Sequence, residues 1–152
     1  MNAEANEPGT AIAETIEYIN ERSQNLVRYS DKLSQAIRAI DKYIEVVGPQ
    51  AGIKFTDSEI FYEEKNIYIF GDVKYRLSVR KDWGLYVVSN IDEAPNHLLT
   101  ESSRAIKKNA IIRLPEFLKL YAAELEKYEM EYRDISEKAE KMAEILSNKE
   151  MA

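Results

Sequence analysis

Hydrophobic positions near each end of the chain recur at alternating steps of four and three residues. Because an α-helix turns once every 3.6 residues, such spacing places the side chains along one side of a helix. The pattern predicts two long helices, residues 10–47 and residues 115–147, each with an apolar seam. The first seam comprises Ile12, Ile16, Ile19, Ser23, Leu26, Ser30, Leu33, Ile37, Ile40, Ile44 and Val47, and the second comprises Leu114, Leu118, Tyr121, Leu125, Tyr128, Tyr132, Ile135, Ala139, Met142 and Leu146.

The middle of the chain, residues 52–91, has a two-residue period instead. Apolar side chains from Val73 to Val79 alternate with polar ones, which is typical of a strand with one buried face. Residues 81–84 predict a turn, and residues 85–88 predict the returning strand of a hairpin. Further strand candidates are residues 66–70 and residues 53–55, whereas residues 57–64 fit either a strand or a short helical turn.

Glycine and proline positions predict where the helices begin and end. Thr10 suits an N-cap after Pro8 and Gly9, and Gly48-Pro49 suits the end of the first helix. Residues 91–99 predict a loop, and residues 100–113 predict a short third helix. Proline lacks a backbone N–H and crowds the preceding turn, so we expect a break or a kink at Pro115 before the last helix.

Each long seam needs a partner, because a helix with one apolar stripe is not stable alone in water. The nearest partner is the other long helix, running antiparallel so that Val47 faces Leu114 and Ser30 faces Tyr132. We therefore expect one domain, residues 1–152, with an α+β fold. In it, two long antiparallel, coiled-coil-like helices flank a small antiparallel sheet of three or four strands, with a short third helix.

Extra apolar residues beside the seams point to a second partner. The extra apolar residues are Tyr29, Ala36, Tyr43 and Val46 on the first helix, and Phe117 and Leu120 on the second. A two-helix seam does not need these side chains. They predict packing against the sheet, the short helix or a second subunit, and a homodimer is the commonest assembly of soluble proteins.

Composition and charge narrow the class of protein. The chain has no cysteine, so disulfides and thiolate chemistry are excluded. We expect a cytoplasmic location and no membrane partner, since Met1–Gly9 lacks the apolar run of a signal peptide and no apolar stretch approaches 18 residues. The net charge is −6, yet the stretch from Lys65 to Arg113 has 9 Lys or Arg against 5 Asp or Glu. The middle is mildly basic and the helices are acidic.

The sequence contains no pattern that is typical of a catalytic or metal site. His97 is the only histidine, and general acid–base or metal chemistry needs partners at set spacing. The glutamates after Glu124 alternate with lysines and arginines, as on a solvated helix face with local ion pairs. Phosphate loops, dinucleotide fingerprints and nucleophile elbows are missing. We predict a protein that is not an enzyme, with no catalytic residue, no cofactor and no bound metal.

The predicted hairpin carries the best candidate for a binding surface. Its residues are Lys74, Arg76, Arg80, Lys81 and Trp83. Basic and aromatic side chains on one strand face are able to bind single-stranded nucleic acid through phosphate contacts and base stacking. The same pattern also arises in a sheet with one solvated face, where Lys and Arg discourage edge pairing. If the short helix lies beside the hairpin, Lys107, Lys108 and Arg113 extend the basic surface.

Two stretches resemble segments of a family of small uncharacterised proteins from microbes and their phages. The resemblance spans about residues 75–120 and implies no activity. It rests on Trp83-Gly84-Leu85-Tyr86-Val87, on Ser103-Arg104-Ala105-Ile106, and on Ala110-Ile111-Ile112-Arg113-Leu114-Pro115-Glu116-Phe117-Leu118. The order helix, hairpins, helix is also similar to prefoldin subunits, which hold unfolded clients between coiled-coil tips; this layout implies a chaperone-like clamp.

Three functions remain open from the sequence. The first is a non-enzymatic interaction or assembly protein that dimerises through its helices and has a protein partner at the sheet. The second is a nucleic-acid-binding protein that uses the hairpin of residues 74–81. The third is the chaperone-like clamp.

Overall fold

The computed structural model of the protein describes residues 2–65, 71–80, 82–91 and 96–151. It has an α+β fold with two long helices and a small antiparallel sheet, as the sequence predicts. The strand predicted at residues 66–70 lies outside the described residues. The elements in chain order are α1 (Asn2–Ala51), β1 (Phe55–Thr56), β2 (Tyr62–Lys65), β3 (Asp72–Val79), β4 (Leu85–Ser89), β5 (His97–Leu98), the 3-10 turn η1 (Leu99–Glu101) and α2 (Arg104–Met151).

Helix α1 is longer than its predicted range at both ends. It begins at Asn2 rather than Thr10, and it passes through Gly48-Pro49 to Ala51. The actual stop is Gly52, which has a φ of 69° and donates its N–H to the Gly48 carbonyl at 2.8 Å. Glycine adopts this left-handed conformation without strain, whereas Pro49 removes only one donor in the last turn.

Helix α2 is continuous through Pro115, so the predicted break there is wrong. Residues 100–101 of the predicted third helix lie in η1, and residues 104–113 lie in α2. Pro115 removes a single intrahelical hydrogen bond, to Ile111. Leu114 and Phe117 on either side of it are buried in the core, and this packing holds the helix together.

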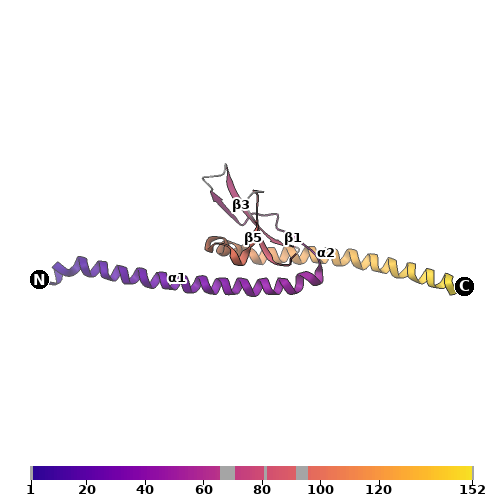
Figure 1. Ribbon diagram of the computed structural model, residues 1–152, viewed down its shortest axis with the longest axis horizontal. Helices are drawn as coiled ribbons and strands as arrows, with labels where there is room; N and C mark the ends of the chain where they lie inside the picture. Colours follow the sequence, from indigo (N-terminus) through magenta and orange to yellow (C-terminus); the bar gives the residue numbers. More distant parts are fainter. Residues whose placement is uncertain (1, 66–70, 81, 92–95, 152) are drawn as a thin grey trace.

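The two helices run in the same direction, so the predicted antiparallel pairing within the chain is also wrong. Arg104 Nε donates to Ser30 Oγ at 3.1 Å, and Lys107 Nζ donates to Ser34 Oγ at 3.0 Å. Residue numbers therefore increase together along both helices. The chain returns through the sheet to the middle of α1 before α2 begins, and the two helices overlap over only part of their lengths (Figure 1).

The sheet is antiparallel, with strand order β1-β3-β4-β5 and with β2 also paired to β3. The predicted β3–β4 hairpin is confirmed, with Val79 opposite Leu85 and Tyr75 opposite Ser89. The candidate strand at residues 53–55 corresponds to β1, and β2 occupies the end of the ambiguous segment 57–64. The predicted loop of residues 91–99 contains β5, which pairs with β4.

The core lies where the sheet meets the overlapping parts of the helices. Ile37 and Ile44 from α1 and Phe117 from α2 pack there against strand residues such as Leu77 and Leu85. Outside this overlap both helices are exposed. We call residues 8–29 of α1 the N-arm and residues 129–149 of α2 the C-arm; they extend from opposite ends of the molecule (Figure 1).

Candidate functional site

The face of the sheet that points away from the helices carries most of the predicted basic residues. Successive side chains of a strand point to opposite faces. In β3, Leu77 and Val79 belong to the core, so Lys74 and Arg76 lie on the opposite face. Tyr86 of β4 lies on that face too, because it is paired with Ser78. We call this side of the sheet the outer face.

The basic side chains on the outer face have acidic and polar neighbours. Arg76 Nε donates to the Ser58 carbonyl at 3.3 Å. Lys74 is paired with Glu63 of β2, and its backbone N–H donates to Asn90 Oδ1 at 2.8 Å. Lys81 lies outside the described residues. The outer face is therefore a mixed surface rather than a purely basic one.

Trp83 is placed differently from the basic residues. It has a φ of 62° in the turn between β3 and β4, and its side chain packs against the core. A Cβ atom placed on Gly48 would lie 2.7 Å from Trp83 Cε3, so the indole rests directly on the backbone of α1. Its ring contributes to packing between the hairpin and α1.

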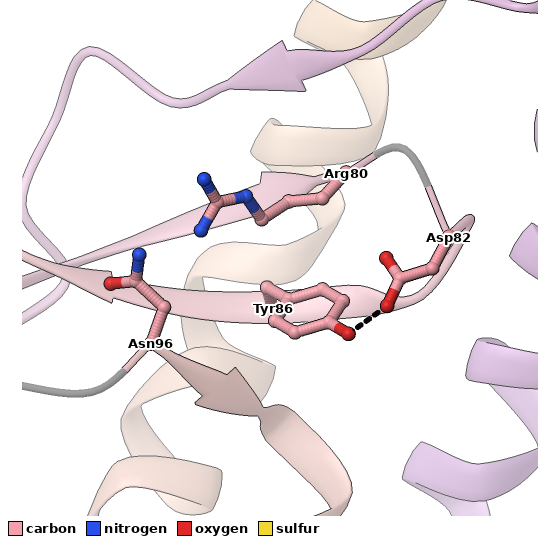
Figure 2. A pocket seen from close by; sticks show the side chains of 4 residues that line it. All are labelled: Arg80, Asp82, Tyr86 and Asn96. Carbon is pink, nitrogen blue, oxygen red and sulfur yellow. Dashed lines mark hydrogen bonds between the residues drawn. The ribbon is translucent and has the colours of Figure 1, made fainter.

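A cavity of about 480 Å³ opens beside the hairpin. Its described lining residues are Arg80, Asp82, Tyr86 and Asn96 (Figure 2). The Tyr86 hydroxyl donates a hydrogen bond to the Asp82 carboxylate, and the Arg80 guanidinium lies 6.0 Å from the centre of the Tyr86 ring. The β3–β4 hairpin supplies a cation, an anion and a phenol, and Asn96, just before β5, adds an amide to the same place.

The electrostatics of this cavity act mainly on the Tyr86 hydroxyl. The hydrogen bond to Asp82 raises the pKa of Tyr86, and burial and the Asp82 charge act in the same direction. The phenol therefore stays protonated at neutral pH. A base and a nucleophile held by a third group, the usual basis of covalent catalysis, are not found among these four side chains.

A buried ion pair lies on the other side of the sheet and was not predicted from the sequence. Arg113 Nε and Nη2 donate to the two carboxylate oxygens of Asp57 at 2.8 and 3.0 Å. Arg113 also contacts Glu59 at 3.0 Å, and the Glu59 N–H donates to Asp57 at 3.0 Å. Since Asp57 and Arg113 are 56 residues apart, no local pattern indicates their contact. The pair joins the β1–β2 connection to α2.

This pairing also limits the basic surface proposed from the sequence. Arg113 is engaged with Asp57, and Lys107 reaches Ser34 of α1. Neither side chain extends the basic surface of the hairpin. They join elements of the fold instead.

The two arms expose long rows of apolar side chains. Ile16 on the N-arm is 52% exposed, and Leu146 on the C-arm is 63% exposed. The exposed apolar residues of the arms are Ile12, Ile16, Tyr18, Ile19, Leu26, Val27, Tyr29, Met130, Tyr132, Ile135, Met142, Ile145 and Leu146. Many of them belong to the two seams. Other parts of the chain cover these seams only where the two helices overlap.

Within the described ranges, no three His, Cys, Asp or Glu side chains are grouped to hold a metal ion. Among the same residues, neither helix has an apolar stretch long enough to cross a membrane. His97 lies in β5 opposite Val87.

Comparison with known proteins gives no relative: no family model matches the chain, and neither a curated protein nor a solved structure is significantly similar to it. The resemblance over residues 75–120 therefore stays an expectation.

Proposed function

We propose that the protein is a non-enzymatic assembly protein that associates with itself through its two helical arms. The observation that carries this proposal is the exposure of both seams over the arms, with Ile16 and Leu146 as examples. Soluble proteins rarely leave a continuous apolar patch of more than a few hundred Å² in water, and larger patches mark interaction sites.

The stability of the arms supports the same proposal. Each arm is a single helix of about 20 residues, and none of its side chains belongs to the core. A helix that packs its apolar face against nothing gains little stability in water. Helical stability in proteins comes mainly from packing an apolar face. Contact with another molecule supplies this packing.

The outer face and its cavity are the proposed site for a protein partner of the assembly. The cavity offers Arg80 and Asp82 as opposite charges around the Tyr86 ring. Interfaces are enriched in Tyr and Arg, which combine apolar contact with hydrogen bonding.

Measurement of the mass in solution tests the proposal. We expect light scattering to give a multiple of 17.6 kDa for the unmodified chain. Leu26→Glu and Met142→Glu each place a carboxylate on a seam and should shift the mass toward the monomer. The matched controls Gln24→Glu and Asn148→Glu add the same group away from the seams and should leave the mass unchanged. A monomer at all concentrations would contradict the proposal.

Nucleic-acid binding is a second candidate, favoured by the presence of Lys74, Arg76 and Tyr86 on one face. Phosphate contacts make such binding fall steeply with salt. Arg76→Glu together with Arg80→Glu should abolish binding to single-stranded oligonucleotides if this candidate is correct. Unchanged weak binding, or none at low salt, would eliminate it.

The arrangement of the two arms does not suit a chaperone-like clamp. A clamp needs two arm tips side by side, whereas the N-arm and the C-arm point away from each other (Figure 1). We do not propose this function.

A further inference from the structure

We propose that the N-arm of one copy pairs with the C-arm of a second copy, antiparallel, and that a twofold axis repeats this pairing at the other end. This inference depends on the proposed self-association and adds the partner, the orientation and the register. The occupant of each exposed seam is thus the other arm of a second copy of this chain.

The placement of the arms in the monomer leads to this orientation. Both helices run in the same direction, and the arms extend from opposite ends (Figure 1). A twofold axis perpendicular to the long dimension reverses the second copy. Its C-arm then lies beside the N-arm of the first copy and runs in the opposite direction. The arms have nearly equal lengths, so neither overhangs the other.

The spacing of apolar positions gives the register. From Ile12 to Leu26 the seam advances by steps of four, three, four and three residues, and from Leu146 back to Tyr132 the steps are the same. Knobs of one helix thus meet holes of the other in every layer. The layers are Ile12 with Leu146, Ile16 with Met142, Ile19 with Ala139, Ser23 with Ile135, and Leu26 with Tyr132 of the second copy.

Side-chain size agrees with this register. The two small residues, Ser23 and Ala139, fall in adjacent layers, and each faces an isoleucine. Large residues opposite small ones let the layers interdigitate without a cavity. A register shifted by one heptad would instead place Ile16 against Lys149 and would require Leu33, which already packs on the core, to face Tyr132.

The offset between the helices gives the position of the axis. Leu146 lies about 60 residues of helical rise beyond Ile12, or roughly 90 Å at 1.5 Å per residue. The midpoint, near Lys42 of α1, is where the proposed twofold axis crosses the long dimension of the molecule.

The area available is enough for a stable dimer. Eight seam residues of each copy are at least 52% exposed: Ile12, Ile16, Ile19, Leu26, Tyr132, Ile135, Met142 and Leu146. The exposed part of such a side chain is on the order of 60–100 Å². Two copies would therefore bury on the order of 1,000–1,600 Å² through these residues, close to the roughly 1,200–2,000 Å² of specific interfaces.

Cysteine pairs test the arrangement cleanly because the natural chain has no cysteine. Ser23→Cys with Ile135→Cys places two thiols in one proposed layer. Within a single copy these positions are separated by about 38 residues of helical rise, roughly 57 Å. A disulfide needs Cα atoms about 4.4–6.8 Å apart, so only two different copies are able to form it.

The expected product of mild oxidation is a covalent dimer of the double variant, with little material above it. Ser23→Cys alone should remain uncrosslinked, because the two copies of residue 23 lie far apart in an antiparallel dimer. Ser23→Cys with Met142→Cys, which is one heptad out of register, should crosslink at least tenfold more slowly than the matched pair. Trp83 fluorescence reports that the core is intact in every variant.

Other results would overturn the inference. Rapid crosslinking of Ser23→Cys alone would indicate parallel pairing of like arms. A ladder of higher products would indicate open head-to-tail chains without a twofold axis. If the natural chain is a dimer by mass and the matched pair does not crosslink, the arm pairing is wrong and the proposed self-association stands. If the natural chain is a monomer, the proposed function itself fails.

Discussion

At the residue scale, Asp57 is the side chain with the most concentrated set of contacts. It is only 1% exposed, and it accepts two hydrogen bonds from Arg113 and one from the Glu59 N–H. Burying a carboxylate is unfavourable unless it is paired and hydrogen-bonded. Both requirements are met here, so the ion pair joins the sheet to α2.

Asp57→Asn should destabilise the protein by about 2–4 kcal/mol, because Arg113 would keep its charge and lose its buried partner. Urea unfolding followed by Trp83 fluorescence measures this loss. Glu59→Gln is the matched control: its side chain is 69% exposed, and exposed ion pairs contribute about 0–1 kcal/mol. Equal effects of the two substitutions would contradict the role given to Asp57.

The same carboxylate predicts a loss of stability in acid. Burial alone would raise the pKa of Asp57, but the hydrogen bonds from Arg113 and Glu59, with the charges of Arg113 and Arg76, hold it below its ordinary value of 3.8. A pKa that is lower in the folded state adds stability above the unfolded value and loses it as the pH falls through the folded value.

The urea midpoint should therefore decrease from about pH 5 downward, as the unfolded carboxyl begins to bind its proton. Asp57→Asn should flatten this decrease, since the amide does not titrate. An identical pH profile for the variant and the natural chain would mean that other carboxylates cause the acid sensitivity.

At the scale of the elements, two contacts add to the core packing between α1 and the hairpin. Asp41 Oδ1 accepts the Leu85 N–H at 2.8 Å at the start of β4, and the Trp83 ring covers Gly48 about two turns further along the helix. Glycine inside a helix is normally unfavourable by roughly 0.5–1 kcal/mol relative to alanine. Gly48 is tolerated because the indole occupies the place of a side chain.

Gly48→Ala should thus destabilise the protein by about 1–3 kcal/mol, because the added methyl group would meet Trp83 Cε3 at 2.7 Å. Gly9→Ala in the same helix is the matched control. Nothing lies within 4 Å of a Cβ atom at Gly9, so this substitution should be neutral or stabilising. Thermal unfolding of both variants distinguishes steric contact from helix propensity; a stabilised Gly48→Ala would contradict the contact.

Local spacing predicted the elements well, and long-range contacts decided what it missed. The seams indicated both long helices, and the alternation from Val73 to Val79 indicated the hairpin. The direction of α2 relative to α1 depends on how far the chain returns through the sheet, which no heptad pattern encodes. The continuous helix at Pro115 likewise depends on the burial of Leu114 and Phe117.

The binding surface was only partly predictable for the same reason. Alternation in β3 correctly placed Lys74 and Arg76 on one face. It did not bring Asn96 beside Tyr86, since Asn96 comes from a separate segment. Trp83, grouped with the basic residues in the sequence, contacts α1 because its turn has a positive φ.

At the scale of the whole molecule, one small core lies between two arms that it does not stabilise. The core combines the sheet with the overlapping parts of α1 and α2, from Ile37 to Ile44 and from Ile106 to Tyr121. The arms make no contribution to it. Stability should therefore divide into a part that depends on protein concentration and a part that does not.

Dilution below the dissociation constant of the dimer should separate these two parts. The freed arms would be single helices of marginal stability, so the helical circular-dichroism signal should decrease. Trp83 is the only tryptophan and packs on the core, so its fluorescence should stay constant over the same range. Leu26→Glu should show the reduced helical signal at all concentrations, whereas Gln24→Glu should follow the natural chain. If both signals change together, arm and core form one cooperative unit, and assembly is then part of folding the core itself.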